Sequence, residues 1–134
     1  MKLSSILSSL LISTLLLMTL QSCQSGLDPK VEAKKAEVMA VHDEVMPLMS
    51  TTRKLKKKIT AHNHGGVDRL INDLDAADET MMQWMSDFNL LDEKKTVETQ
   101  MEFLDKMEGE ANKMKAQFAK AINNAENYVN NHKH

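Results

Sequence analysis

One histidine and four methionines recur at helical spacing in two separate segments of the chain. His42, Met46 and Met49 are separated by steps of four and three residues, which places them on one flank of a helix. Met81 and Met85, four residues apart, form a similar group further along. Imidazole and thioether groups suit Cu(I), so the pattern is compatible with a copper site between two helices. Methionine at this spacing more often fills a core, and we favour that interpretation.

The two groups would lie at the same height if their helices were antiparallel. Met46 is nineteen residues before Gly65, and Met85 is nineteen residues after Gly66. A turn at the paired glycines would therefore bring the two groups level. This symmetry keeps copper or another metal as an alternative hypothesis.

No other constellation of reactive residues in the sequence predicts a catalytic centre. A di-iron carboxylate bundle needs Glu-x-x-His on inward helix faces, and the residue three before His42 is Met39. No serine occupies a strand-turn-helix elbow, and no glycine-rich loop has the phosphate-binding pattern. We therefore predict that the protein has no catalytic residue and is not an enzyme.

Two histidine pairs and a basic run have simple interpretations. His62 with His64, and His132 with His134, have the spacing of a loose divalent-metal site, but solvated loop and tail positions explain them better. The basic run at residues 53–58 could touch anionic lipid, although cations near the end of a helix also complement its dipole. We favour the solvated interpretation in each case.

Cys23 is the only cysteine in the chain, and it follows a segment typical of export. Lys2 is the only charge in residues 1–22, and an apolar run diluted by serines covers residues 6–20. Such a run enters the translocon without having to remain as a span. The motif Leu20-Gln21-Ser22-Cys23 resembles a lipobox, in which an apolar residue at −3 and a small residue at −1 precede a modified cysteine.

The lipobox resemblance implies a signal peptide over residues 1–22 and a lipid anchor at Cys23. The thiol would take a diacylglycerol, and the amine freed by cleavage would take a fatty acid such as palmitate. Together these chains would hold the protein stably, whereas one would not. Two alternatives remain: residues 3–20 as an uncleaved span at the lower limit of length, and Cys23 as an ordinary thiol without an intrachain partner. We expect no cofactor beyond the covalent lipid, with copper as the alternative.

The residues after the signal have the size and composition of one helical domain. Of 134 residues, 112 follow residue 22, and their 16 basic and 19 acidic side chains give a formal charge of −3. This balance excludes a nucleic-acid partner. Alanine, lysine, glutamate, methionine and leucine dominate, which favours helix.

The first helical stretch begins after Asp28, the expected cap, with Pro29 in its first turn. Its apolar face shows a heptad spacing. The residues at that spacing are Val31, Val38, Val45, Thr52 and Ile59. Pro47 lies inside the pattern and predicts a kink with the same register on both sides. The glycines at 65 and 66 predict the end of the helix.

Two more helical stretches follow, over residues 67–88 and 94–130, with a connection at residues 89–92. Gly109 lies within the last stretch and predicts local weakness without a break. Three amphipathic helices with short loops predict an all-α, antiparallel up-down-up bundle with long first and third helices. We divide the chain into a signal at 1–22, a lipidated tether at 23–29, a bundle at 30–131 and a frayed tail at 132–134.

Two motifs carry a resemblance to a known group. His-Asp-Glu-Val-Met-Pro at residues 42–47 and Met-Met-Gln-Trp-Met at residues 81–85 resemble small lipoproteins of Bacteroidota that are often labelled viral A-type inclusion proteins. The resemblance implies a location and an architecture, but no activity. The acidic cluster that accompanies surface export in such bacteria is missing from residues 24–28. We therefore expect an outer-membrane position that faces the periplasm.

These observations together predict a membrane-tethered, non-enzymatic helical module of the cell envelope. Its expected partner is an envelope protein or a second copy of itself, because the unequal lengths of the predicted helices leave room for a groove. The interaction surface is not specified by the sequence. The alternative is an envelope protein that binds Cu(I) or another metal through the His/Met residues.

Overall fold

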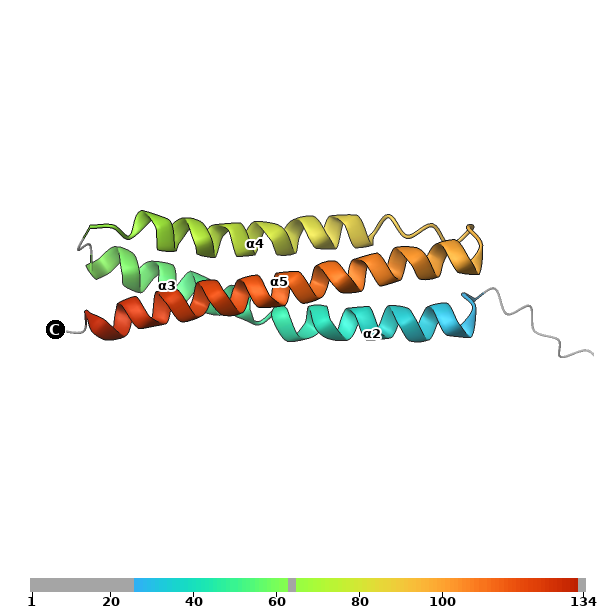
Figure 1. Ribbon diagram of the computed structural model, residues 1–134, viewed down its shortest axis with the longest axis horizontal. Coiled ribbons are helices and arrows are strands. Elements are labelled where there is room, and N and C mark those ends of the chain that lie inside the picture. Colours follow the sequence, from blue (N-terminus) through green and yellow to red (C-terminus); the bar gives the residue numbers. More distant parts are fainter. Residues whose placement is uncertain (1–25, 63–64, 133–134) are drawn as a thin grey trace, which may run out of the picture.

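The computed structural model describes residues 26–62 and 65–132, and these residues form helices without any strand (Figure 1). The signal at 1–22, Cys23 and the first residues of the tether lie outside the described part. The helices are α2 (Pro29–Val45), α3 (Leu48–His62), α4 (Asp68–Phe88) and α5 (Val97–Asn131). None of these helices is long and apolar enough to cross a bilayer.

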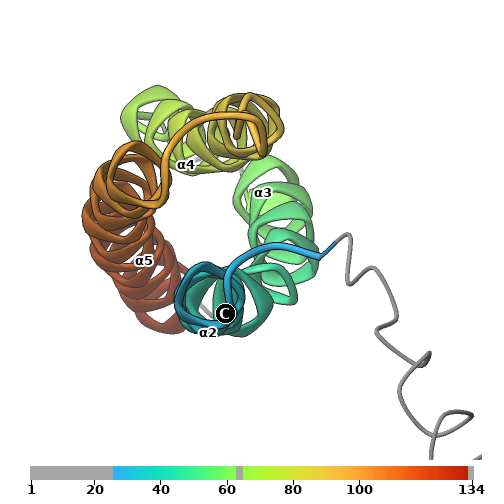
Figure 2. The same ribbon diagram turned by 90° about the vertical axis from the view of Figure 1, so that its right-hand side faces the viewer.

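The helices pass along the bundle three times. α2 and α3 follow one another in one direction, α4 returns beside them, and α5 runs the full length in the first direction (Figure 1). Seen along the long axis, α4, α5 and the α2–α3 pass surround a common interior (Figure 2). The predicted up-down-up three-helix bundle with long first and third passes is confirmed.

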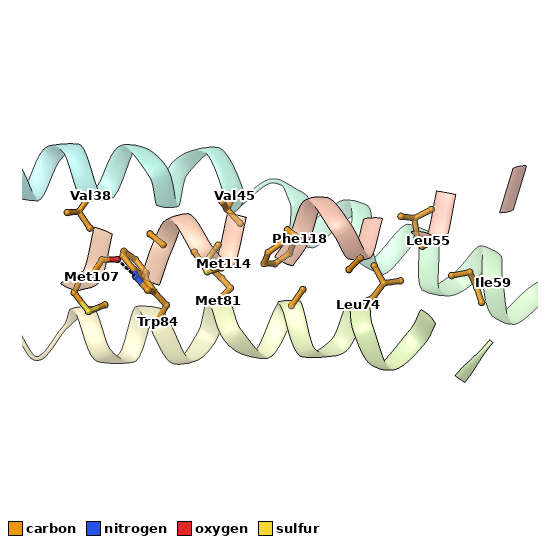
Figure 3. Packing of buried hydrophobic residues seen from close by; sticks show 14 of the residues in the cluster. Val38, Val45, Leu55, Ile59, Leu74, Met81, Trp84, Met107, Met114 and Phe118 are labelled. Atoms are coloured by element: carbon orange, nitrogen blue, oxygen red, sulfur yellow. Dashed lines mark hydrogen bonds between the residues drawn. The ribbon is translucent and has the colours of Figure 1, made fainter. Parts of the chain in front are cut away.

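The heptad positions of the first pass form one side of the core. Each of the five residues at seven-residue spacing, including the polar Thr52, has no exposed surface. Val38 and Val45 of α2 and Leu55 and Ile59 of α3 point toward the side chains of α4 and α5 (Figure 3). One apolar stripe therefore continues through both helices, as a single heptad register predicts.

Pro47 interrupts the first pass without changing that register. α2 ends at Val45 and α3 begins at Leu48, and the Met46 N–H still donates to the His42 carbonyl at 2.8 Å. Pro47 has no N–H to continue the ladder, and its ring crowds the preceding turn. Its own carbonyl accepts from Ser50 at 3.1 Å, which starts the next helix. The predicted kink is confirmed.

The helix ends are set by local hydrogen bonds. The predicted cap is confirmed, because the Asp28 carboxylate accepts the Lys30 N–H at 2.9 Å. The last helix, however, begins at Val97, three residues later than the predicted start at Lys94. Thr96 is the reason: it adopts an extended conformation, and its hydroxyl accepts the Thr99 N–H.

Gly65 and Gly66 form the turn between α3 and α4. Both have positive φ angles, 70° and 73°, a region that side chains with a Cβ rarely enter. The paired glycines thus explain why the first pass ends here and the chain reverses.

Gly109 is the one glycine within a helix in the described residues, and α5 continues through it. A Cβ at this exposed position would meet no atom within 4 Å. We expect Gly109→Ala to raise the free energy of unfolding by about 0.5–1 kcal/mol, because alanine loses less backbone entropy in a helix. Urea unfolding followed by circular dichroism measures this change, and a lower midpoint for the variant would contradict it.

Candidate functional site

Three aromatic rings stack between the first and second passes of the bundle. His42 of α2 and Trp84 of α4 have ring centroids 5.5 Å apart at 19°, and Trp84 stacks on Phe88 at 5.0 Å. We call these three residues the aromatic layer. The Trp84 indole N–H donates to the Met107 carbonyl of α5 at 2.9 Å, which connects the layer to the third pass (Figure 3).

The two nitrogens of His42 have different surroundings. Nδ1 lies 3.0 Å from the Asp43 carboxylate, at the edge of the bundle. Nε2 is buried and has no hydrogen-bond partner among the described residues. A buried polar atom without a partner costs about 1–3 kcal/mol relative to a paired one. The Nε2 atom is therefore the one polar atom of the layer whose hydrogen bonding is not satisfied within the described residues.

The methionines predicted to accompany His42 occupy different environments. Met81 is completely buried in the core, whereas Met46, beside the kink, is 44% exposed. Met49 and Met85 are partly buried and pack against the core. The core interpretation therefore holds in full for Met81 and in part for Met49 and Met85.

Acidic and histidine ligands do not gather into a metal centre within residues 26–62 and 65–132. No group of three or more His, Cys, Asp or Glu side chains there is placed to hold an ion. His64, His134 and the side chain of His62 lie outside the described part. The His132 ring stacks on Tyr128 at 4.2 Å, and its Nδ1 lies 2.8 Å from the Tyr128 carbonyl.

A polar cluster connects α3 with α4 on the other side of the kink. The Lys56 ammonium lies 2.5 Å from the Asp75 carboxylate and 3.0 Å from that of Asp78. The buried Thr52 hydroxyl lies 2.8 Å from both the Asp78 carboxylate and the Met49 carbonyl. Hydrogen bonds from Lys56 to Asp75 and then Asp78 raise the pKa of the lysine, against the opposing effect of its burial.

This cluster confirms the expected position of the turn. Lys56 is nine residues before Gly65, and Asp75 is nine residues after Gly66, so the two side chains are level. The same count fails at the aromatic layer, where His42 is 23 residues before the turn and Trp84 is 18 after it. Pro47 lies between the two sites, at the break between α2 and α3.

The raised pKa of Lys56 predicts how stability depends on pH. The lysine contributes fully below the pKa of the unfolded chain, about 10.4, and this contribution is lost as pH rises through the higher folded value. We expect Lys56→Met to be less stable than the parent protein at pH 8 and the difference to shrink above about pH 10.4. Urea midpoints measured for both proteins from pH 8 to pH 11.5 test this, and a constant difference would contradict it.

A second polar cluster was not predicted from the sequence. Lys34 of α2 lies 2.7 Å from Glu108 and 3.0 Å from Asp105 of α5. Hydrogen bonds to Glu108 and then Asp105 raise the lysine pKa well above its usual range. Lys34 lies three residues after the core position Val31, so its place on the inner flank of the helix was the available signal.

No protein-family model, no curated protein and no solved structure matches the chain.

Proposed function

We propose that the protein is a lipoprotein of the cell envelope, anchored through Cys23, that acts as a non-enzymatic interaction or structural module. The observation that carries the proposal is where the bundle begins. Leu27 already packs against the core and Asp28 caps α2, and these two residues follow Cys23 by only four and five positions. A lipid at Cys23 would therefore hold the bundle by one end.

The shape of the bundle suggests what such an anchor would achieve. α5 has 35 residues and is about 52 Å long at 1.5 Å per residue. Its C-terminal end lies at the opposite end of the bundle from the start of α2 (Figure 1). The module would hold a partner about one bundle length from the membrane. We propose an envelope protein or a second copy as that partner, and an outer-membrane location that faces the periplasm.

The chemistry of the surface favours a polar contact with that partner. Among the described residues only three large apolar side chains are strongly exposed, namely Met46, Met82 and Leu90. Charged side chains cover the outside, and some of them are paired between helices, as Glu44 is with Lys115. The likeness of residues 42–47 and 81–85 to small Bacteroidota lipoproteins supports the same location.

The anchor is tested by Cys23→Ser in the full-length chain. We expect the parent protein to take up labelled palmitate and sediment with membranes, because two or more acyl chains hold a protein stably. The variant should take up none and remain in the soluble fraction. Met82→Ser, a change on the exposed face of α4, is the matched control and should behave like the parent. A parent protein without label would refute the anchor.

The interaction is tested separately, by crosslinking in intact envelopes followed by mass spectrometry. The proposal expects a defined crosslinked species that contains either a second copy or one other envelope protein. A lipoprotein that stays a monomer and forms no such species would refute the interaction role while leaving the anchor intact.

Metal binding is the second candidate, and the unpaired Nε2 of His42 is the observation that favours it. His42 would supply the imidazole and the partly buried Met49 and Met85 the thioethers, with Met46 and Met81 as further candidates. Anaerobic Cu(I) titration of the purified lipoprotein tests this. Binding tighter than micromolar that is lost in His42→Ala and kept in Met82→Leu supports it, and no such binding refutes it.

A further inference from the structure

The connection between α4 and α5 carries the most exposed of the large apolar side chains. Leu90 is 71% exposed, although the other apolar residues of the bundle are mostly buried. Its neighbour Leu91 packs against the core and so fixes the backbone beside it. A hollow of about 190 Å³ lies next to the two leucines, with Phe103 on its α5 side. Leu90 is therefore an exposed apolar side chain at a partly apolar end of the bundle.

This end of the bundle is also the one where the chain begins. The start of α2 and the α4–α5 connection lie at the same end in both views (Figures 1 and 2). The Lys35 ammonium of α2 lies 3.6 Å from the Glu93 carboxylate of the connection, which joins the two segments directly. The opposite end holds the α3–α4 turn and the end of α5.

The sequence limits how far this end can be from the anchor. Cys23 precedes Gly26, the first described residue, by three positions. A chain spans at most about 3.6 Å per residue, so these three steps cover at most about 11 Å. A lipid at Cys23 would thus keep the end that carries Leu90 beside the membrane surface.

We infer that this end rests on the lipid surface and that Leu90 inserts into the interfacial region. The inference rests on the proposed lipid anchor and adds an orientation to it. Because the anchor already holds this end of the bundle at the surface, insertion of the leucine requires no separate association step, and one apolar side chain is able to bias the orientation of the bundle. The lysines at 94 and 95 adjoin the acidic residues at 92 and 93, so opposite charges balance here. The contact is therefore apolar and does not require anionic lipid.

The lipid modification itself makes a clean experiment possible. A diacylglycerol on Cys23 consumes the only thiol of the chain, so a cysteine introduced elsewhere becomes the single reactive site. Leu90→Cys and, at the opposite end, the exposed Ala61→Cys are prepared as full-length, processed lipoproteins and labelled with an environment-sensitive fluorophore. Both are reconstituted into phosphatidylcholine vesicles that contain a lipid-borne quencher.

We expect quenching at position 90 to exceed that at position 61 by about fivefold or more, and to change little when anionic lipid is added. Equal quenching at the two positions would overturn the inference. A second pair of variants carries the label at the exposed position 95, through Lys95→Cys, and therefore keeps the native Leu90. When Leu90→Ser is added to Lys95→Cys, we expect the quenching of the label at position 95 to fall. If Leu90→Ser leaves the quenching at position 95 unchanged, the inference is also overturned.

Failure of the anchor and failure of the docking give different results. A parent protein that does not float with the vesicles has no anchor, and both the proposed function and this inference then fall. A protein that floats, but whose position 90 is quenched no more than position 61, keeps its anchor and refutes the docking alone.

Discussion

Trp84→Ala is expected to lower the free energy of unfolding by about 3–5 kcal/mol. The indole is 3% exposed, stacks on two rings, and donates its N–H to the Met107 carbonyl of another helix. Alanine removes all of these contacts and leaves a cavity between the passes. Since domains of this size are stable by about 5–15 kcal/mol, the loss is a large part of the total.

Urea unfolding followed by circular dichroism at 222 nm measures the Trp84 effect. Met82→Ala, two residues earlier on the same helix, is the control, and its exposed side chain should change stability by less than about 0.5 kcal/mol. Trp84→Phe keeps much of the ring but loses the N–H, so it should lie between the parent and Trp84→Ala. Equal stability of the Trp84→Ala variant and the parent would contradict the proposed role of the layer.

Phe118→Ala is expected to be of similar size, about 3–5 kcal/mol. Among the described residues, Phe118 has the largest side chain of those with almost no exposed surface. Along the bundle it lies between Val45 and Leu55, the residues on either side of the kink (Figure 3). The ring therefore fills the interior where the first pass bends, and its replacement by alanine leaves a cavity in the core.

The matched control for Phe118 is Phe103→Ala on the same helix. Phe103 is only partly buried, so the same chemical change should cost clearly less. Thermal and urea unfolding of both variants give the comparison. A loss at position 103 as large as that at position 118 would show that burial does not determine the cost.

The core of this bundle was predictable because it depends on periodicity alone. A seven-residue repeat places Val31, Val38, Val45, Thr52 and Ile59 on one face, and all five are fully buried. Pro47 does not change this heptad register, because it bends the helix axis without adding or removing a residue. The turn at residues 65 and 66 was predictable for a similar reason, since paired glycines are required by positive φ angles.

The contacts between helices were harder to predict, because they depend on the position of each residue along the bundle axis as well as on the side of the helix that it occupies. Counting from the turn places Lys56 correctly beside Asp75. On the other side of Pro47 the same count places His42 five residues too far from the turn to be level with Trp84, although the two rings stack. The same count was used to predict that the two groups of methionines are level. A count of residues carries no information about burial, so it could not predict that Met46 is exposed and Met81 is buried.

The start of the last helix shows a different limit of sequence reasoning. Lysine and glutamate at positions 93–95 favour helix by composition, but the threonine at 96 offers a hydroxyl to the free N–H of residue 99. The Asp92 carboxylate and carbonyl also accept the N–H groups of Lys94 and Lys95, so local hydrogen bonds hold these residues in a turn against their helix propensity. The buried Gln100 stabilises this arrangement by donating to the Lys95 carbonyl at 2.8 Å.

The odd number of passes determines how the molecule would bear mechanical load. Because the helices run along the axis three times, the start of α2 and the end of α5 lie at opposite ends (Figure 1). Tension applied between these ends pulls α2 and α5 past one another along their lengths and does not peel one from the other. Such shear loads the buried contacts between α2 and α5 along the length of their interface at once, whereas peeling would break them one after another.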